Sequence, residues 1–242
     1  MRVTIAIPAY DEVTNLERAV TEARAEIAAI GPAGDGEVLV VDDGSRDGTS
    51  VLADELAAMH ADVRVVHHEK NRGFSGAMAT CFRQARGDWV FLAPADGQSS
   101  MSELGKFLEM SSRADVVVGV RESRADHAGR QLMSRTFHGI ARVLLAIPVP
   151  EFSSIFLFRR ALLETMPFRS RERSATILPE ILFRARQRNA TFATVVVPHF
   201  PRRSGRAKGG SLAVAFFTLV GLIRLAVLVR LDELRNVRHI ET

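Results

Sequence analysis

Hydrophobic and polar positions form blocks along the chain that predict strands and helices in turn. Short apolar runs, typical of strands buried on both faces, occupy residues 2–7, 37–41, 63–66, 89–92 and 116–120. Helical periodicity occupies the intervening residues 15–30, 49–59 and 76–85. Because alternation of strand and helix favours parallel pairing, we expect an α/β fold with a Rossmann-like, mostly parallel sheet and helices on both faces.

The second half of the chain is less regular. The pattern predicts helices at 127–147 and 175–188, strands at 153–159 and 192–197, and a basic, glycine-rich loop at 201–210. Neither an internal repeat nor a linker is evident. We therefore expect one domain over residues 1–210, followed by an apolar or amphipathic helix and tail over 211–242.

Three loops that follow predicted strands carry acidic or turn residues, at 8–12, 42–49 and 93–99. In open α/β sheets, ligands bind outside the carboxyl ends of the strands. Asp42 and Asp43 close one strand, where carboxylates can accept hydrogen bonds from a ribose or a base; the alternative is an acidic turn with a helix cap. Asp96 and Gln98 offer oxygen ligands for Mg²⁺ or Mn²⁺ with a diphosphate; the alternative is a plain turn.

Composition and charge narrow the class of partner. Hydrophobic residues make up 47% and charged residues 25%, as in ordinary globular proteins, and a net charge of +4 suits anionic partners. One Trp, one Tyr and the absence of a nucleic-acid-binding motif argue against nucleic acid. The single cysteine, Cys81, excludes an internal disulfide and is expected to be buried on a helix. No charged-then-apolar leader is evident, so secretion is not expected. His67 and His68 lack zinc-ligand spacing with cysteines, so no metal role is expected for them.

Four segments in a fixed order resemble the family 2 glycosyltransferases, and among them the polyprenyl-phosphate branch. The segments are Pro8-Ala-Tyr-Asp-Glu12, Val41-Asp-Asp-Gly-Ser-Arg-Asp-Gly-Thr49, Lys70-Asn-Arg-Gly73 and Gly87-Asp-x-x-x-x-x-Pro-Ala-Asp-Gly-Gln98. The resemblance covers about residues 2–210. It implies the GT-A fold and inverting transfer of a sugar from a GDP- or UDP-linked donor. The implied acceptor is a polyprenyl phosphate.

The resemblance also implies site residues. For the donor they are Pro8, Tyr10, Glu12, Asp42, Asp43, Lys70, Gly73 and Ala95. For the metal they are Asp96 and Gln98. For catalysis and phosphate contacts they are Asp96, Arg121, Arg130, Ser134, Glu180, Pro198, Arg202, Gly205 and Lys208. The chain departs from the family pattern at Pro94, at Pro150-Glu151 and at Phe156, and the first of these leaves Asp96 with less protein help in binding metal.

The acceptor decides the mechanism. A lipid phosphate is already anionic, so transfer to it needs positioning and charge stabilisation rather than a base. The alternatives are transfer to a hydroxyl of a polysaccharide or glycolipid, with Glu180 or Glu151 as base, and a non-catalytic nucleotide-sugar-binding protein, suggested by Pro94. A nicotinamide enzyme is excluded, because no Gly-x-Gly-x-x-Gly follows the first strand.

The apolar tail predicts peripheral contact with a membrane. Arg224 interrupts residues 212–229, and an arc of polar positions follows helical spacing through Thr218, Gly221, Arg224, Asp232 and Arg235. We expect this helix to lie on the cytoplasmic face of the plasma membrane. A membrane span, disfavoured by Arg224 and by the basic residues after it, and a buried core or dimer helix are the alternatives, so a homo-oligomer stays open.

Overall fold

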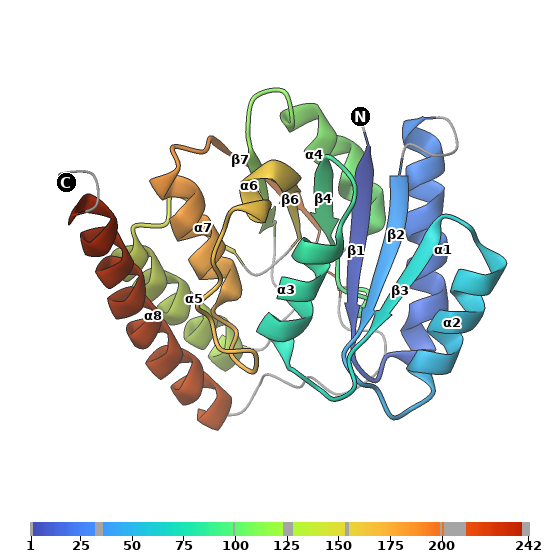
Figure 1. Ribbon diagram of the computed structural model, residues 1–242, viewed down its shortest axis with the longest axis horizontal. Helices are drawn as coiled ribbons and strands as arrows, with labels where there is room; N and C mark the ends of the chain where they lie inside the picture. The colour runs from blue at the N-terminus through green and yellow to red at the C-terminus, as the bar shows by residue number, and fades with distance from the viewer. Residues whose placement is uncertain are drawn as a thin grey trace.

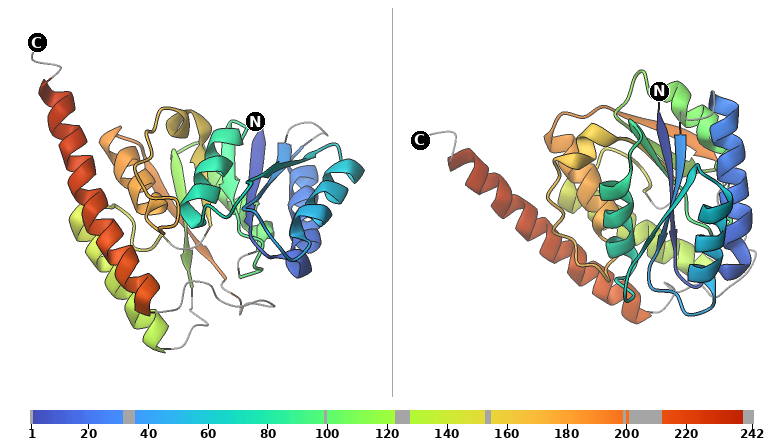
Figure 2. Two further views of the ribbon diagram at one scale, coloured as in Figure 1. Left: turned by 60° about the horizontal axis from the view of Figure 1, so that its bottom comes forward. Right: turned by 45° about the vertical axis from the view of Figure 1, so that its right-hand side comes forward.

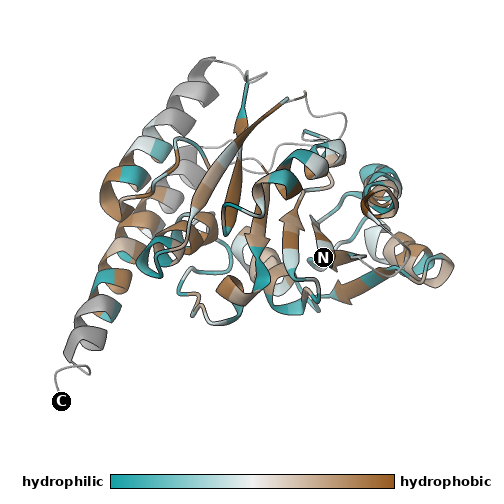
Figure 3. Ribbon diagram, turned by 90° about the horizontal axis from the view of Figure 1, so that it is seen from above, coloured by the Kyte–Doolittle hydropathy of each residue, from teal (hydrophilic) through white to brown (hydrophobic). Residues whose placement is uncertain are grey.

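A computed structural model describes residues 2–31, 36–98, 100–122, 128–152, 155–198, 200 and 212–238. Seven strands form one sheet in the order β3-β2-β1-β4-β6-β5-β7 (Figure 1). Their bounds are β1 (Val3–Ala9), β2 (Gly36–Asp42), β3 (Val63–His67), β4 (Trp89–Leu92), β5 (Val116–Arg121), β6 (Phe156–Arg159) and β7 (Phe192–Val197). The strands are hydrophobic along most of their length in Figure 3, as expected for a sheet covered on both faces.

Every strand pair in the sheet is parallel except the two that involve β6. β1 pairs in parallel with β2 and β4, β2 with β3, and β5 with β7, whereas β6 is antiparallel to β4 and β5. The predicted α/β, mostly parallel sheet is therefore confirmed. The reversed direction of β6 was not predicted.

Helices cover both faces of the sheet (Figures 1 and 2). One core includes residues of α1 (Val13–Ile30), α2 (Thr49–Met59) and α4 (Leu104–Met110), which follows the short 3-10 helix η1 (Met101–Glu103). The other core includes residues of α3 (Phe74–Gln84), α5 (Ala128–Leu145), α6 (Arg160–Glu164), α7 (Ile177–Gln187) and α8 (Leu212–Arg238). Cys81 is fully buried on α3, as predicted.

Most predicted elements are present, with ends shifted by no more than three residues within the domain, and α2, β4 and β7 match the predicted bounds. The helix expected at 76–85 begins two residues earlier, at Phe74, and the strand expected at 153–159 begins at Phe156. The sequence pattern did not predict η1, α4 or α6. These helices are too short for apolar residues to repeat at helical spacing over several turns. The predicted domain boundary near residue 210 stays a prediction, because residues 201–211 lie outside the described part of the chain.

Helix α8 packs on the domain beside α5 and shares its core (Figures 1 and 2). Leu222, Leu225, Ala226 and Val229 are buried in that core. Two positions of the predicted polar arc also face the protein: Asp232 pairs with Arg184, and Gly221 lies against Ser174 and Thr176. Of the described helices, none is long and apolar enough to cross a membrane.

The face of α8 that points away from the domain carries exposed apolar side chains. Val220, Ile223, Val227 and Leu231 are between 46% and 53% exposed, and Arg224 of the predicted polar arc is also exposed. Helical spacing shows which residues share a face but not which face the domain covers, so the contacts of Gly221 and Asp232 with the domain were not predicted.

Candidate functional site

The loops after β1 and β2 are joined by hydrogen bonds at the carboxyl edge of the sheet. The Asp11 amide donates to Ser45 Oγ at 2.9 Å, and the Arg46 amide donates to Asp11 Oδ1 at 2.8 Å. The Glu12 amide donates to Thr49 Oγ1 at 2.9 Å. β1 and β2 are neighbours in register, so their ends bring these two acidic loops together as predicted.

Asp42 is held by hydrogen bonds from Ser45, Ser50 and His67 at the end of β2. Its Oδ1 accepts from the Ser45 amide at 3.1 Å, and its Oδ2 accepts from Ser50 Oγ at 2.6 Å and lies 2.9 Å from His67 Nδ1. Burial alone would raise the pKa of Asp42. The hydrogen bonds from Ser45, Ser50 and His67 lower it by more than burial raises it, so the net shift of the pKa is downward. Asp42 therefore remains an anion at neutral pH.

Asp43 holds the loop that follows β3. Its Oδ1 lies 2.7 Å from His68 Nδ1 and accepts from the Arg72 amide at 2.8 Å, while Oδ2 accepts from the Gly73 amide at 2.8 Å. Gly73 has a φ of 79°, and a Cβ there would lie 2.7 Å from the Arg173 Cα. Glycine is therefore required at position 73 both by the backbone conformation and by close packing.

Asp43 keeps room for one more hydrogen bond. A carboxylate oxygen offers two lone-pair positions, and Oδ2 of Asp43 accepts only from the Gly73 amide among the described residues. Asp42 already takes hydrogen bonds from the backbone and side chain of Ser45, from Ser50 and from His67. Both side chains are nearly covered, at 1% and 4% exposed, and the Lys70 backbone packs directly on Gly44 beside them. Their assignment to the donor nucleoside stays a prediction; the described contacts add that both organise the surrounding loops.

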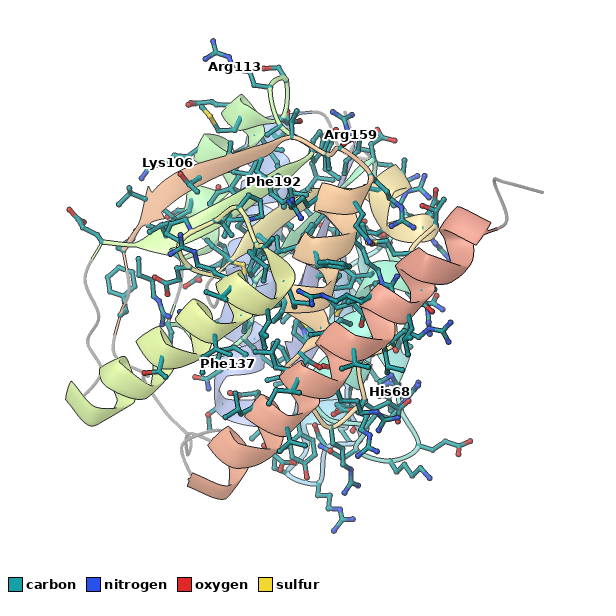
Figure 4. The ribbon with its side chains drawn as sticks, turned by 90° about the vertical axis from the view of Figure 1, so that its left-hand side faces the viewer. His68, Lys106, Arg113, Phe137, Arg159 and Phe192 are labelled. Atoms are coloured by element: carbon teal, nitrogen blue, oxygen red, sulfur yellow. The ribbon has the colours of Figure 1, made fainter. Side chains whose placement is uncertain are left out.

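His67 and His68 were missed from the sequence. His67 bridges Asp42 and Asp54, and His68 bridges Asp43 and the Thr80 hydroxyl. Burial alone would lower the pKa of His67. The carboxylates of Asp42 and Asp54 raise it by more than burial lowers it, so the net shift of the pKa is upward. The only available signal was that a His-His pair and an Asp-Asp pair end two predicted strands. Figure 4 places His68 at the opposite end of the molecule from Arg113 and Arg159.

The candidate metal loop follows β4. The Gln98 backbone amide donates to Asp96 Oδ1 at 3.1 Å, Gly97 has a φ of 70°, and Asp96 Oδ2 has no hydrogen bond to the described residues. Within the described part of the chain, no group of three His, Cys, Asp or Glu residues is placed to hold a metal. One free carboxylate oxygen suits a cation that takes its other ligands from a diphosphate and water. Gly97 also packs against Arg18, whose Nη2 is buried without a hydrogen bond.

Arg121 forms a buried ion pair with Glu151. The Arg121 side chain is 8% exposed and that of Glu151 is 10% exposed. The sequence predicted that Arg121 faces a phosphate and offered Glu151 as an alternative base. The structure brings the two together, so each balances the charge of the other, and their predicted roles toward substrate stay predictions.

Glu180 is fully buried and has structural contacts. Its carboxylate accepts hydrogen bonds from the Arg169 and Ser170 amides, both at 2.7 Å, and pairs with Arg184 at 2.9 Å. Arg184 also lies 3.4 Å from Asp232 on α8. The predicted catalytic role of Glu180 stays a prediction, but these contacts fix the segment before α7.

The remaining predicted residues divide into described and undescribed ones. Pro8, Tyr10 and Pro198 are half-buried, Ala95 is buried, and the Lys70 side chain is exposed. Arg202, Gly205 and Lys208 lie outside the described residues, and so do the side chains of Arg130 and Ser134.

The chain belongs to glycosyl transferase family 2, because the model of that family matches residues 4–175. It is 31% identical over 209 residues to an undecaprenyl-phosphate 4-deoxy-4-formamido-L-arabinose transferase of Pseudomonas fluorescens (strain SBW25), covering 85% of this chain and 59% of the relative. It is 30% identical over 151 residues to the glycosyltransferase AglD of Haloferax volcanii, covering 60% of this chain and 24% of that protein. The chain thus spans about three fifths or less of these relatives.

Solved structures confirm the GT-A fold. A glucosyl-3-phosphoglycerate synthase from Mycobacterium tuberculosis, in complex with phosphoglyceric acid, has a TM-score of 0.71 at 18% identity, covering 93% of this chain and 80% of that one. A mannosyltransferase from Pyrobaculum calidifontis, in complex with GDP-Man and Mn²⁺, has a TM-score of 0.66 at 22% identity, covering 93% and 64%.

Replacing Asp43 with alanine tests whether this residue holds the loop after β3 and contributes to nucleotide binding. The change leaves the Arg72 and Gly73 amides without their acceptor, so the free energy of unfolding should fall by about 1–3 kcal/mol and nucleoside diphosphate affinity by about tenfold. Calorimetry and denaturant unfolding measure the two effects. Asp62→Ala, which removes a carboxylate paired with Arg24, should leave the affinity unchanged. Equal affinities for wild type and Asp43→Ala would contradict the assignment.

Proposed function

We propose that this protein transfers a sugar from a nucleotide-sugar to a polyprenyl phosphate with inversion at the anomeric carbon. The proposal is carried by one observation: in a family 2 chain, the two acidic loops and the Asp96 loop meet the carboxyl edge of the sheet. The name of the Pseudomonas relative, an undecaprenyl-phosphate transferase, supports the choice of acceptor.

The donor nucleoside binds at Asp42 and Asp43 in this proposal. The remaining acceptor position on Asp43 suits a base N–H or a ribose hydroxyl, and the Asp42 carboxylate precedes it at the end of β2. Structural neighbours were solved with UDP and with GDP-Man, so either nucleotide is compatible with the fold. Lys70 and Gly73 lie on the loop held by Asp43 and thus border the nucleoside.

The donor diphosphate lies by Asp96 and Gln98. These residues would hold Mg²⁺ or Mn²⁺, which when bound neutralises charge on the leaving nucleoside diphosphate. Two structural neighbours contain Mn²⁺, which supports this assignment. The Arg18 guanidinium packs against Gly97 and is paired with Glu22 through Nη1, which leaves its Nη2 facing the loop.

The described contacts favour a lipid phosphate over a hydroxyl as acceptor. Transfer to a hydroxyl needs a free carboxylate base, yet Glu180 and Glu151 are each buried in an ion pair with an arginine. A phosphate is anionic at neutral pH and attacks the anomeric carbon without a base. The protein then has to position it and stabilise charge, and Arg202 and Lys208 of the basic loop supply cations for that purpose.

Transfer assays with the two basic-loop variants test the acceptor. Arg202→Ala and Lys208→Ala should lower transfer to undecaprenyl or dolichyl phosphate by about tenfold or more, because each removes a charged contact to phosphate. Nucleotide affinity should change much less. Arg113→Ala, an exposed arginine at the far end of the molecule, should behave as wild type.

Two outcomes would contradict the proposal. If the purified protein ignores every polyprenyl phosphate but glycosylates a hydroxyl, the enzyme class stands and the acceptor is wrong. If it binds nucleotide-sugars and shows no turnover with any lipid extract, it is a binding protein. As a transferase, it acts at the cytoplasmic face of the plasma membrane, because nucleotide-sugars are cytosolic and a polyprenyl chain stays in the bilayer.

A further inference from the structure

A crevice rich in arginine and hydroxyl groups separates the segment before α7 from α8. Its lining consists of Arg169, Ser170, Arg171, Ser174, Thr176, Gly221, Arg224, Leu225 and Leu228. Gly221 faces this segment, since a Cβ there would lie 3.5 Å from Thr176 Cγ2, an ordinary van der Waals distance. The lining thus combines cations, small hydroxyl side chains and two leucines of α8.

The cations of this crevice are largely uncompensated. Arg171 and Arg224 are exposed and have no partner among the residues that the structure describes. Arg169 lies 3.4 Å from Asp232, a carboxylate that it shares with Arg184. The crevice is therefore positively charged. At about 20 Å³ it has room for little more than one water-sized group, so a phosphate would contact the exposed Arg171 and Arg224 at its mouth, where arginine can donate two parallel hydrogen bonds.

An exposed apolar face of α8 lies directly beside the crevice. The face consists of Val220, Ile223, Val227 and Leu231. At about 100° per residue, Arg224 and Arg230 fall at its two margins. Arg230 also donates a hydrogen bond to the backbone carbonyl of Leu144 on α5. The residue before it on α5, Val143, is 81% exposed. An apolar face bordered by arginines is the pattern of a helix that lies in the interface of an anionic bilayer.

We infer that Arg171 and Arg224 at the mouth of the crevice bind the phosphate of an anionic lipid headgroup while the apolar face of α8 lies against the acyl chains. The occupant is thus an anionic phospholipid surface, favoured by the charge of the crevice and by the continuity of the apolar face with it. The inference rests on the proposed function in one respect: a lipid acceptor requires the protein to meet a membrane.

The crevice is linked to the candidate donor site through the segment before α7. Ser174 O accepts from the Ser75 amide at 3.2 Å and from Ser75 Oγ at 2.8 Å, and Glu172 O accepts from the Gly76 amide at 3.0 Å. These contacts join the segment to the start of α3, directly after Gly73. A bilayer held by α8 therefore lies on the side of the Lys70–Gly73 loop.

Vesicle sedimentation of the full chain tests the inference. Wild type should bind phosphatidylglycerol-containing vesicles and bind phosphatidylcholine vesicles much more weakly. The double variant Arg171→Ala/Arg224→Ala should lose that preference by about tenfold or more, and Ile223→Glu/Val227→Glu should lose binding to both. The matched controls Arg113→Ala and Val51→Glu change an exposed arginine and an exposed valine on other elements, and both should bind as wild type.

Three results would overturn the inference. Wild-type binding by both double variants would show that neither crevice nor face contacts lipid. Complete displacement from vesicles by inorganic phosphate at constant ionic strength would show that the crevice is a site for the free ion. A dimer that Ile223→Glu/Val227→Glu converts to a monomer, with vesicle binding unchanged, would assign the face to a second copy. Donor and acceptor are absent from these assays, so vesicle binding without transfer activity would contradict only the proposed function.

Discussion

Asp96→Asn is expected to lower the rate of sugar transfer by about a hundredfold or more. The change removes the charge of the candidate metal ligand, and with it the stabilisation of the nucleoside diphosphate leaving group. The loop should keep its shape, because an asparagine oxygen can still accept the hydrogen bond from the Gln98 amide. Single-turnover rates measured across a titration of Mg²⁺ and Mn²⁺ give the size of the effect.

The matched control for this variant is Asp88→Asn. Asp88 is an exposed carboxylate before β4 that accepts from the Arg2 amide, so the same chemical change occurs at the opposite edge of the sheet. Its turnover and metal dependence should equal those of wild type. Full turnover of the wild-type protein in the presence of a chelator would exclude the metal role of Asp96 and Gln98.

The Glu180→Gln variant is expected to lose about 3 kcal/mol of stability. Glutamine carries no charge, so Arg184 is left buried with only the more distant Asp232 as a charged partner. One of the Arg169 and Ser170 amides also loses a good acceptor. In a domain of this size the melting temperature should fall by about 10 °C.

Denaturant unfolding of Glu180→Gln beside Glu164→Gln measures this loss. Glu164 forms an exposed ion pair with Arg160, so its replacement should change the free energy of unfolding by less than about 1 kcal/mol. A Glu180→Gln protein with wild-type stability and no activity would contradict the structural role. It would also assign a base to the reaction and favour a hydroxyl acceptor.

The sequence predicted the part of the site that depends on one strand and the loop after it. Apolar runs placed β1, β2 and β4, and parallel pairing then brought Glu12, Asp42 and Asp96 to one edge. The periodicity of buried strands and helices is a local property, so a single sequence reveals it. The family resemblance added roles for these residues, but their positions followed from the pattern alone.

Contacts between distant segments could not be predicted in the same way. The Arg121–Glu151 pair and the His67–Asp42 contact join residues 30 and 25 positions apart, and no periodicity records which side chains meet across such distances. The orientation of α8 on the domain could not be predicted for a related reason. Its sequence has apolar residues on two opposite sides, and only the surface of the domain decides which side is buried.

The reversed direction of β6 determines whether the residues before it or those after it in the sequence reach the site. A parallel strand delivers the residues that follow it to the carboxyl edge, as β4 delivers Asp96. β6 runs the other way between β4 and β5, so it delivers the residues that precede it. Glu151 reaches Arg121 at the end of β5 by this route. Insertions that alter the site at the carboxyl edge are therefore expected after each of the six parallel strands, but before β6.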